Sequence, residues 1–168
     1  MADTRAEREA TLVRLMNTYA DVLTGLCVGI LGDRALAQDA VQETFLKAWR
    51  GLGRFRGERA DSEKAWLYRI AINQCRSMRR SRWLRHVPLE EAASLAAPAP
   101  EEKGLLSSLK SLRPRSREVL LLRYLEEMSV SDMAEALGIT PSSVYRRLEA
   151  ARAELEETLE RQEKEDEG

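Results

Sequence analysis

The sequence predicts an all-α protein of two small helical domains joined by a flexible linker, with a helix-turn-helix in the second domain. Apolar residues recur at helical spacing through most of the 168 residues, and no segment reads as a strand. A stretch with three prolines and four acidic residues, VPLEEAASLAAPAPEEKG, separates two helical regions. The expected boundaries are 1–86 for the first domain, 87–104 for the linker, 105–160 for the second domain and 161–168 for an acidic tail.

The first domain is expected to hold three helices. The first covers about residues 4–31, where the apolar side chains follow one helical face: Leu12, Leu15, Tyr19, Val22, Leu26 and Ile30. The second covers about residues 33–50, with Asp33 as its cap and an apolar residue at every fourth position: Ala37, Val41, Phe45 and Trp49. The glycines of GLGRFRGERAD then predict a loop, and a third helix follows over about residues 62–82.

The second domain is expected to begin with a short helix that contains Leu105, Leu109 and Leu112. Pro114 suits the first turn of the next helix, over residues 114–126, because that position needs no backbone N–H. At the far end of the domain, the chain from Glu154 onward is expected to be a helix that frays into solvent.

Residues 129–155 contain the starts of two helices and one break. Ser129 and Asp132 resemble a capping box, and Gly138 provides the left-handed residue that ends a helix. Thr140 caps the next helix and Pro141 fills its first position. The residues expected to face the core are Met133, Ala134, Leu137, Val144, Leu148, Ala151 and Leu155. Two short helices at such a tight turn predict a helix-turn-helix, although a plain helical hairpin could use the same caps.

In a helix-turn-helix the second helix enters the DNA major groove with its N-terminal residues leading. The candidates for contact with DNA are Thr140, Ser142, Ser143, Tyr145, Arg146, Arg147 and Glu149. Arginines early in this helix favour a DNA reader over the plain hairpin.

The third helix carries a basic face. At about 100° per residue, an apolar side with Leu67, Ala71, Cys75 and Met78 opposes a polar side with Arg69, Asn73, Arg76 and Arg80. Arginines beside aromatic residues suit the binding of phosphates and unstacked bases. The alternative is a face that is merely solvated. If these are surface positions, their replacement is expected to change stability by less than about 0.5 kcal/mol.

Charge is segregated behind the formal net charge of −1. Residues 1–86 carry 16 Lys/Arg against 10 Asp/Glu, whereas residues 154–168 carry two against eight. This asymmetry predicts that one part of the protein meets a polyanion. The N-terminus lacks an apolar signal core and no run of about 18 apolar residues occurs, so a cytoplasmic protein without membrane insertion is expected.

The sequence offers no chemistry for an enzyme. It contains one histidine, His86, and shows no carboxylate pair, Gly-rich phosphate loop or metal cluster, so no catalytic residue, metal or cofactor is expected. Cys27 and Cys75 lie in apolar helical patterns and are expected to be buried free thiols. A disulfide or a redox sensor is the alternative for this pair.

Two blocks of the sequence resemble bacterial sigma factors of the extracytoplasmic-function group, within the sigma-70 family. The first block is similar to their second conserved region and reads DAVQETFLKAWRGLGRFRGERADSEKAWLYRIAINQCRSMRRSR. The second is similar to their fourth region and reads SLRPRSREVLLLRYLEEMSVSDMAEALGITPSSVYRRLEAARAEL. The order of the blocks and the intervening linker also match, and together they cover about 130 of the 168 residues.

The resemblance implies a transcription initiation factor that binds core RNA polymerase through the β′ clamp and the β flap and reads −10 and −35 promoter elements. Polymerase binding is then expected at Asp39, Gln42, Glu43, Phe45 and Trp49. Recognition and melting of the −10 element are expected at Phe55, Arg56, Trp66, Arg69, Asn73, Arg76 and Arg80. The recognition helix for the −35 element corresponds to residues 140–152. An anti-sigma factor is an expected partner, and the free protein is expected to be a monomer.

This sequence departs from the family pattern at two places. Tyr145 stands where a basic residue is usual, and Arg146 is the neighbouring candidate for the −35 contact. Glu127 or Met128 stands where the family often has glycine. Two other protein classes remain as alternatives: a sigma-like decoy that binds an anti-sigma protein but no promoter, and an ordinary two-domain repressor. The decoy would not need the basic face, and the repressor would not need the polymerase-like helix.

Overall fold

The computed structural model describes residues 4–55, 60–84 and 107–168, with the backbone alone at residues 60–62 and 82–84. Every regular element in these ranges is helical, which confirms the predicted all-α class. The predicted linker, residues 87–104, lies outside the described residues, as does His86. The elements in chain order are α1 (Arg5–Leu31), α2 (Arg34–Gly51), η1 (Leu52–Arg54), α3 (Ala60–Leu84), α5 (Pro114–Leu120), η2 (Leu121–Leu125), α6 (Val130–Leu137) and α7 (Pro141–Asp166), with a further helical turn at residues 107–111 between α3 and α5.

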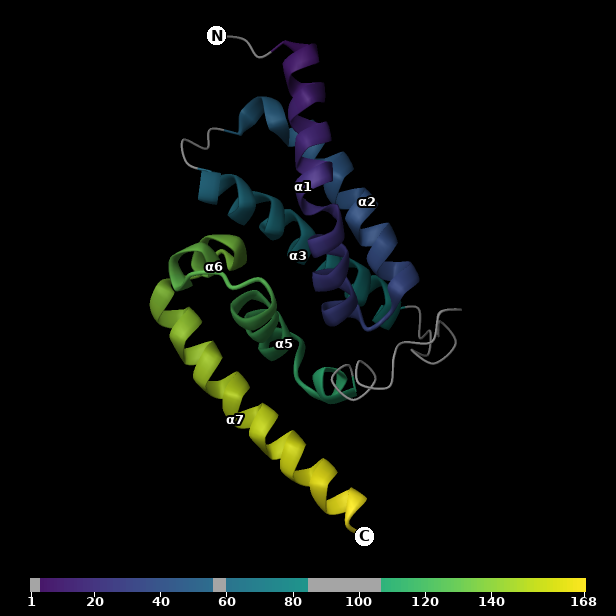
Figure 1. Ribbon diagram of the computed structural model, residues 1–168, viewed down its shortest axis with the longest axis vertical. Coiled ribbons are helices and arrows are strands. Elements are labelled where there is room, and N and C mark those ends of the chain that lie inside the picture. The colour runs from purple at the N-terminus through teal and green to yellow at the C-terminus, as the bar shows by residue number, and fades with distance from the viewer. Residues whose placement is uncertain (1–3, 56–59, 85–106) are drawn as a thin grey trace.

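The first half of the molecule is a three-helix unit. Helices α1 and α2 form an antiparallel hairpin, and α3 packs against both (Figure 1). Gly32 turns the chain between them with φ 69°, a left-handed conformation that glycine adopts without strain. The Asp33 carboxylate then accepts a hydrogen bond from the Leu36 N–H at 2.9 Å and caps α2, as predicted.

Two cysteines lie in the core of this half, on α1 and α3. Cys27 and Cys75 are both buried and free, which confirms the prediction of buried thiols and contradicts the disulfide alternative. A hydrogen bond with Cys75 and burial raise the pKa of the Cys27 thiol. Because the thiolate is the reactive form, a thiol held protonated in the core is a poor redox sensor.

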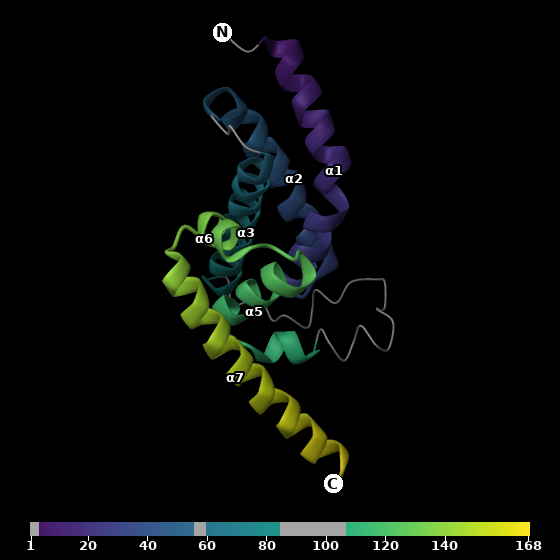
Figure 2. The same ribbon diagram turned by 60° about the vertical axis from the view of Figure 1, so that its left-hand side comes forward.

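The second half places α5, η2 and α6 beside the long helix α7 (Figure 2). The helix predicted over residues 114–126 has two parts: α5 ends at Leu120 and a π-helical turn, η2, follows. The Glu126 N–H reaches back to the Leu121 carbonyl at 3.0 Å, and the chain leaves through Glu127 in a left-handed conformation with φ 51°. The predicted helical span is therefore confirmed to within one residue, and the sequence did not indicate that its last turn is the wider π-helical type.

The predicted fraying from Glu154 is also wrong, since α7 continues to Asp166. The Glu154 carboxylate accepts hydrogen bonds from the Arg113 N–H at 2.5 Å and from the Ser116 hydroxyl at 2.6 Å. Further along, Thr158 is buried and Gln162 accepts a hydrogen bond from Ser108. Residues ahead of α5 and in its first turn therefore stabilise the second part of α7, which its acidic sequence alone does not indicate.

The two halves pack against each other through α3 on α6 and through α1 on α5 and η2 (Figures 1 and 2). Leu121 lies so close to Gly29 of α1 that a Cβ there would sit 2.8 Å from its methyl groups. The buried Tyr68 hydroxyl donates to the Glu126 carboxylate at 2.5 Å. Burial raises the pKa of Glu126, while the hydrogen bond from Tyr68 opposes that effect. The resulting hydrophobic core runs without interruption through both halves.

Candidate nucleic-acid interface

The helix-turn-helix geometry follows from caps encoded within a dozen residues. The Ser129 hydroxyl accepts from the Asp132 N–H at 3.1 Å, which starts α6. Gly138 ends α6 with φ 68° and ψ 36°. The Thr140 hydroxyl then accepts from the Ser143 N–H at 3.2 Å and starts α7, with Pro141 in its first turn. The predicted caps at Ser129 and Thr140 and the left-handed Gly138 are confirmed, whereas of the predicted capping box only the bond to the Ser129 hydroxyl is present.

The first turns of α7 present a polar surface on one side and an apolar seam on the other. The side chains predicted to face inward are buried at Val144, Leu148 and Ala151, and partly buried at Leu155. The Arg146 guanidinium lies on the outer side and donates to the Ser143 hydroxyl at 3.1 Å. The exposed side chains of this surface are Thr140, Ser142, Tyr145, Arg146 and Glu149. Hydroxyl, guanidinium and carboxylate groups at the N-terminal end of a helix are the groups that read base edges in a major groove.

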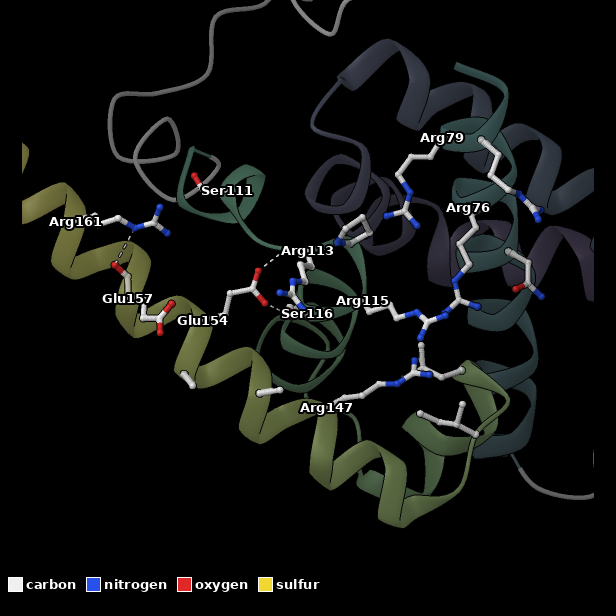
Figure 3. Close-up of a pocket in the computed structure, with 17 residues that line it drawn as sticks. Arg76, Arg79, Ser111, Arg113, Arg115, Ser116, Arg147, Glu154, Glu157 and Arg161 are labelled. Atoms are coloured by element: carbon white, nitrogen blue, oxygen red, sulfur yellow. Dashed lines mark hydrogen bonds between the residues drawn. The ribbon is translucent and has the colours of Figure 1, made fainter. Parts of the chain in front are cut away.

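Arg147 is placed differently from its neighbour. It is half-buried and points from α7 toward α3 and α5, where Arg115 and Arg76 also point (Figure 3). Burial lowers the pKa of Arg147, and the positive charges of Arg115 and Arg76 lower it further. In this arrangement of the halves, Arg147 belongs to a cavity between them and not to the outer surface of α7.

An aromatic pair marks the start of α3. The ring of Phe55 stacks on Trp66 with centroids 4.5 Å apart and planes 26° apart. The sequence assigned both residues to the same −10 site, and the structure brings them together. Arg56, assigned to that site too, lies outside the described residues. Both residues are only partly buried.

The basic face of α3 is exposed at Arg69, Asn73 and Arg80, as predicted. Arg76 is the exception, since its guanidinium forms two hydrogen bonds with the Glu118 carboxylate, at 3.1 and 2.8 Å. The Glu118 side chain is 0% exposed, and Arg79 also reaches it at 3.4 Å. The hydrogen bond with Glu118 raises the pKa of Arg76. The prediction that Arg76 is a plain surface position was therefore wrong, because a helical wheel cannot show which other element packs on that side.

Sequence reasoning also missed Glu118 as a structural partner. The signal was present in SREVLLLRYL, where one carboxylate stands directly before an apolar run. A buried carboxylate requires a cationic partner. The choice of partner, 42 residues earlier on α3, depends on how the halves pack.

The predicted polymerase-binding residues divide into two groups on α2. Asp39 and Gln42 are exposed and Glu43 is partly exposed. Neither carboxylate has a cation within ion-pair distance in the part of the chain that the structure describes. Phe45 is 6% exposed and packs in the core, so the structure contradicts its assignment to a contact surface. Trp49 is partly buried, and the Arg8 guanidinium lies 5.5 Å from its ring centre.

Neither a membrane-spanning helix nor a metal site occurs within the described ranges. No helix there is both long enough and apolar enough to cross a bilayer. No group of three or more His, Cys, Asp or Glu side chains in those ranges is arranged to hold a metal ion.

The comparisons with known proteins agree with the two-block reading. The sequence profile of Sigma-70 region 2 matches residues 15–85, and that of Sigma-70, region 4 matches residues 103–155. The ECF RNA polymerase sigma factor SigL of Mycobacterium tuberculosis is 32% identical over 164 residues, which cover 92% of each chain. The probable RNA polymerase sigma factor RfaY of Xanthomonas campestris is 33% identical over 162 residues, but this chain spans only 40% of its length.

Two solved structures share the fold. CnrH, in complex with the cytosolic domain of CnrY, has a TM-score of 0.71 and 27% identity over 90% of this chain and 89% of CnrH. RpoE of Bartonella quintana, in complex with the anti-sigma factor NepR, has a TM-score of 0.74 over 88% of this chain and 95% of RpoE. At 24% identity the second similarity concerns the fold alone.

Proposed function

Since this chain belongs to the extracytoplasmic-function group of the sigma-70 family, whose members are non-catalytic, promoter-specific transcription initiation factors, we propose that its two halves read two separate promoter elements. The first half would bind core RNA polymerase and the −10 element, and the second half the −35 element and the β flap. The observation that carries this proposal is the exposed polar surface at the start of α7, held by the Gly138 turn. A monomer in the cytoplasm, where polymerase and chromosome meet, suits this role.

The proposed −35 contact uses the outer side of α7. Arg146 is exposed beside Tyr145 and donates to Ser143, so its guanidinium is held near the leading end of the helix. An arginine in this place can form a bidentate contact with guanine. Arg147, one position on, is better placed for phosphate once the halves separate.

The proposed −10 site combines the aromatic pair with the basic face. The partly exposed rings of Phe55 and Trp66 offer a stacking surface, and Arg69, Asn73 and Arg80 lie further along α3. A flipped base needs a stacking partner, and the displaced strand needs cations along its backbone. These groups support a role in melting as well as in recognition.

Reading both elements requires the halves to separate. In the structure, Arg76 of the proposed −10 site and Arg147 of the proposed −35 site face the same cavity. Two promoter boxes lie one or more turns of DNA apart, each turn about 34–36 Å. The 18 residues of the predicted linker reach at most about 60 Å when extended, which is enough for this span.

An anti-sigma factor is part of the proposal because a protein with the same fold, RpoE of Bartonella quintana, was solved in complex with the anti-sigma factor NepR. Binding of the anti-sigma factor to this chain would prevent the chain from binding core RNA polymerase. Co-purification of this chain with the product of a neighbouring gene, followed by loss of transcription in its presence, would support that partner.

The test of the main proposal is reconstitution with core polymerase. We expect the holoenzyme to start transcription at a limited set of genomic sites that share two upstream boxes. Transcript starts mapped across the genome give function and specificity together. A chain that binds an anti-sigma protein but yields no promoter-dependent transcript would be a decoy. A chain that binds DNA as a dimer without polymerase would be a repressor.

Melting is tested separately, with permanganate footprinting of −10 thymines on linear DNA. The double substitution Arg69→Ala and Arg80→Ala is expected to reduce open complexes more than closed ones, since these cations hold the strand only after it is displaced. A template that is already unpaired should restore part of the loss. Normal melting by the double variant would remove α3 from the proposed mechanism.

A further inference from the structure

A large cavity lies between the two halves, bounded by α3, α5 and α7 (Figure 3). Its volume is about 1200 Å³, slightly above the usual range of small-molecule sites of about 300–1,000 Å³. The arginines that line it are Arg76, Arg79, Arg80, Arg113, Arg115, Arg147 and Arg161. Among the residues that the structure describes, the carboxylates in its lining are Glu154 and Glu157.

Most of this positive charge has no partner. The buried Glu118 carboxylate, which does not line the cavity, forms ion pairs with Arg76 and Arg79. The Glu154 carboxylate is occupied by the Arg113 N–H and the Ser116 hydroxyl. Across the described parts of the chain, five arginines of the lining have no carboxylate within ion-pair distance: Arg80, Arg113, Arg115, Arg147 and Arg161.

The side chains also converge. Arg76, Arg115 and Arg147 come from α3, α5 and α7, and their guanidinium groups point toward one another (Figure 3). Burial and the two neighbouring charges lower the pKa of Arg147. Arg79 carries a buried N–H group without a hydrogen-bond acceptor. Like charges in one cavity repel each other, and a bound anion would remove that repulsion.

We propose that this cavity binds a compact polyanion with several phosphate groups, which bridges the two halves and holds them together. A guanidinium group can donate two parallel hydrogen bonds to two oxygens of one phosphate group. Arginines from three helices therefore suit a ligand with several phosphate groups. A single phosphate would reach only one or two of these guanidinium groups. Because the guanidinium groups converge within one cavity, they suit a compact ligand better than an extended duplex.

Binding would also regulate the protein, a consequence that rests on the proposed function. Arg76 and Arg147 cannot hold the ligand and contact promoter DNA at the same time. A ligand that binds only the closed arrangement shifts the population toward it, in proportion to its differential affinity. Promoter use should therefore fall as the ligand concentration rises.

Binding is tested on the full chain by calorimetry with inorganic tripolyphosphate, without polymerase or DNA, in about 150 mM salt to screen surface attraction. The test variant is Arg113→Gln with Arg115→Gln, whose side chains make no hydrogen bond within the described residues and lie outside the proposed DNA site. The matched control is Arg34→Gln with Arg50→Gln, which removes two exposed charges from α2. The test variant should bind about tenfold or more weakly, the effect of losing one charge-assisted hydrogen bond. The control should match the wild type.

Equal affinities of the two double variants would overturn the proposal, and so would the absence of binding to the wild type. Tripolyphosphate should also raise the thermal midpoint of the wild type and the control, but not of the test variant. Tighter binding of ATP than of tripolyphosphate would identify a nucleoside polyphosphate, and equal binding an inorganic one. Tighter binding of hexaglutamate than of either would overturn the phosphate assignment. Because no step uses polymerase, failure here leaves the proposed transcription function untouched.

Discussion

Arg146 and Arg147 are neighbours in sequence but occupy different environments. Arg146 lies on the outer surface of α7, whereas Arg147 is half-buried and points into the cavity between the halves. Adjacent residues on a helix are about 100° apart, so the side chains of two consecutive arginines point to different sides of the helix. Their different environments predict different effects on DNA recognition.

Arg146→Ala should relax the choice of base at one −35 position, because a bidentate contact with guanine contributes about 1–3 kcal/mol of discrimination. Arg147→Ala should weaken binding to all sequences alike, as expected for a phosphate contact. The measurement is holoenzyme binding to a library of randomised −35 boxes. Identical sequence profiles for the two variants would contradict this division of roles.

Glu127 shows strain at a single residue. It is the only described residue other than glycine with a positive φ, 51°. The left-handed conformation costs a residue with a Cβ about 1–2 kcal/mol. Glu127→Gly should therefore raise the free energy of unfolding, by about 0.5–1 kcal/mol after the greater entropy of glycine in the unfolded chain is subtracted.

Urea denaturation of Glu127→Gly measures this effect, with Glu135→Gly as the matched control. Glu135 is exposed within α6, where glycine should lower stability by about 1 kcal/mol. Destabilisation of similar size in both variants would show that Glu127 is not strained.

At the scale of the element, the sequence predicted those helix ends that depend on residues close to them in the chain. Ser129, Gly138 and Thr140 act on groups within five residues of themselves, so the start and end of α6 and the start of α7 could be predicted from the sequence. The end of α7 could not, because Glu154 binds the backbone of Arg113, 41 residues away. From its sequence alone, an acidic helix is expected to be unstable, because the contacts that stabilise it come from distant parts of the chain.

Glu154→Ala should lower stability by about 1–3 kcal/mol, because it leaves the Arg113 N–H and the Ser116 hydroxyl without their acceptor. Glu156→Ala, an exposed position two residues on, should change stability by less than about 0.5 kcal/mol. Thermal denaturation followed by circular dichroism compares the two. Equal and small effects would mean that the second part of α7 does not depend on Glu154.

The outer surface of α2 carries a prediction about polymerase. Asp39 and Glu43 are one turn apart, and neither has a cationic partner in the described residues. Charge reversal at both should weaken the binding of core polymerase by a few kcal/mol if the contacts are desolvated, and it should leave the fold intact. Titration of labelled core polymerase measures this. Unchanged affinity would exclude this surface.

At the scale of the whole molecule, the contact between the halves is the feature that sequence reasoning did not reach. The wheel of α3 correctly separated an apolar side from a basic side. It could not show that Arg76 on the basic side meets the buried Glu118 of α5. Packing between distant segments depends on their shared geometry, and periodicity within one helix carries no information about it.

Glu118→Gln should open the molecule, because the neutral amide no longer balances Arg76 and Arg79. Loss of this pair should cost about 1–3 kcal/mol, below the value for a fully buried pair, since Arg76 is 30% exposed. Small-angle scattering should show a larger radius of gyration while helicity is retained. Glu135→Gln, on the exposed side of α6, should leave the radius unchanged. A compact Glu118→Gln variant would mean that apolar contacts alone hold the halves.

The close approach of Gly29 to Leu121 means that a larger side chain at residue 29 could force the two halves apart. The three atoms nearest to a Cβ built at Gly29, apart from the helix and chain neighbours of Gly29 itself, all belong to the Leu121 side chain. A leucine at residue 29 would thus push directly on η2 while every arginine and every carboxylate of the chain stayed in place. In such a variant the two halves would be separated by side-chain volume alone. The arrangement of the halves could then be changed without any change in the charge of the protein.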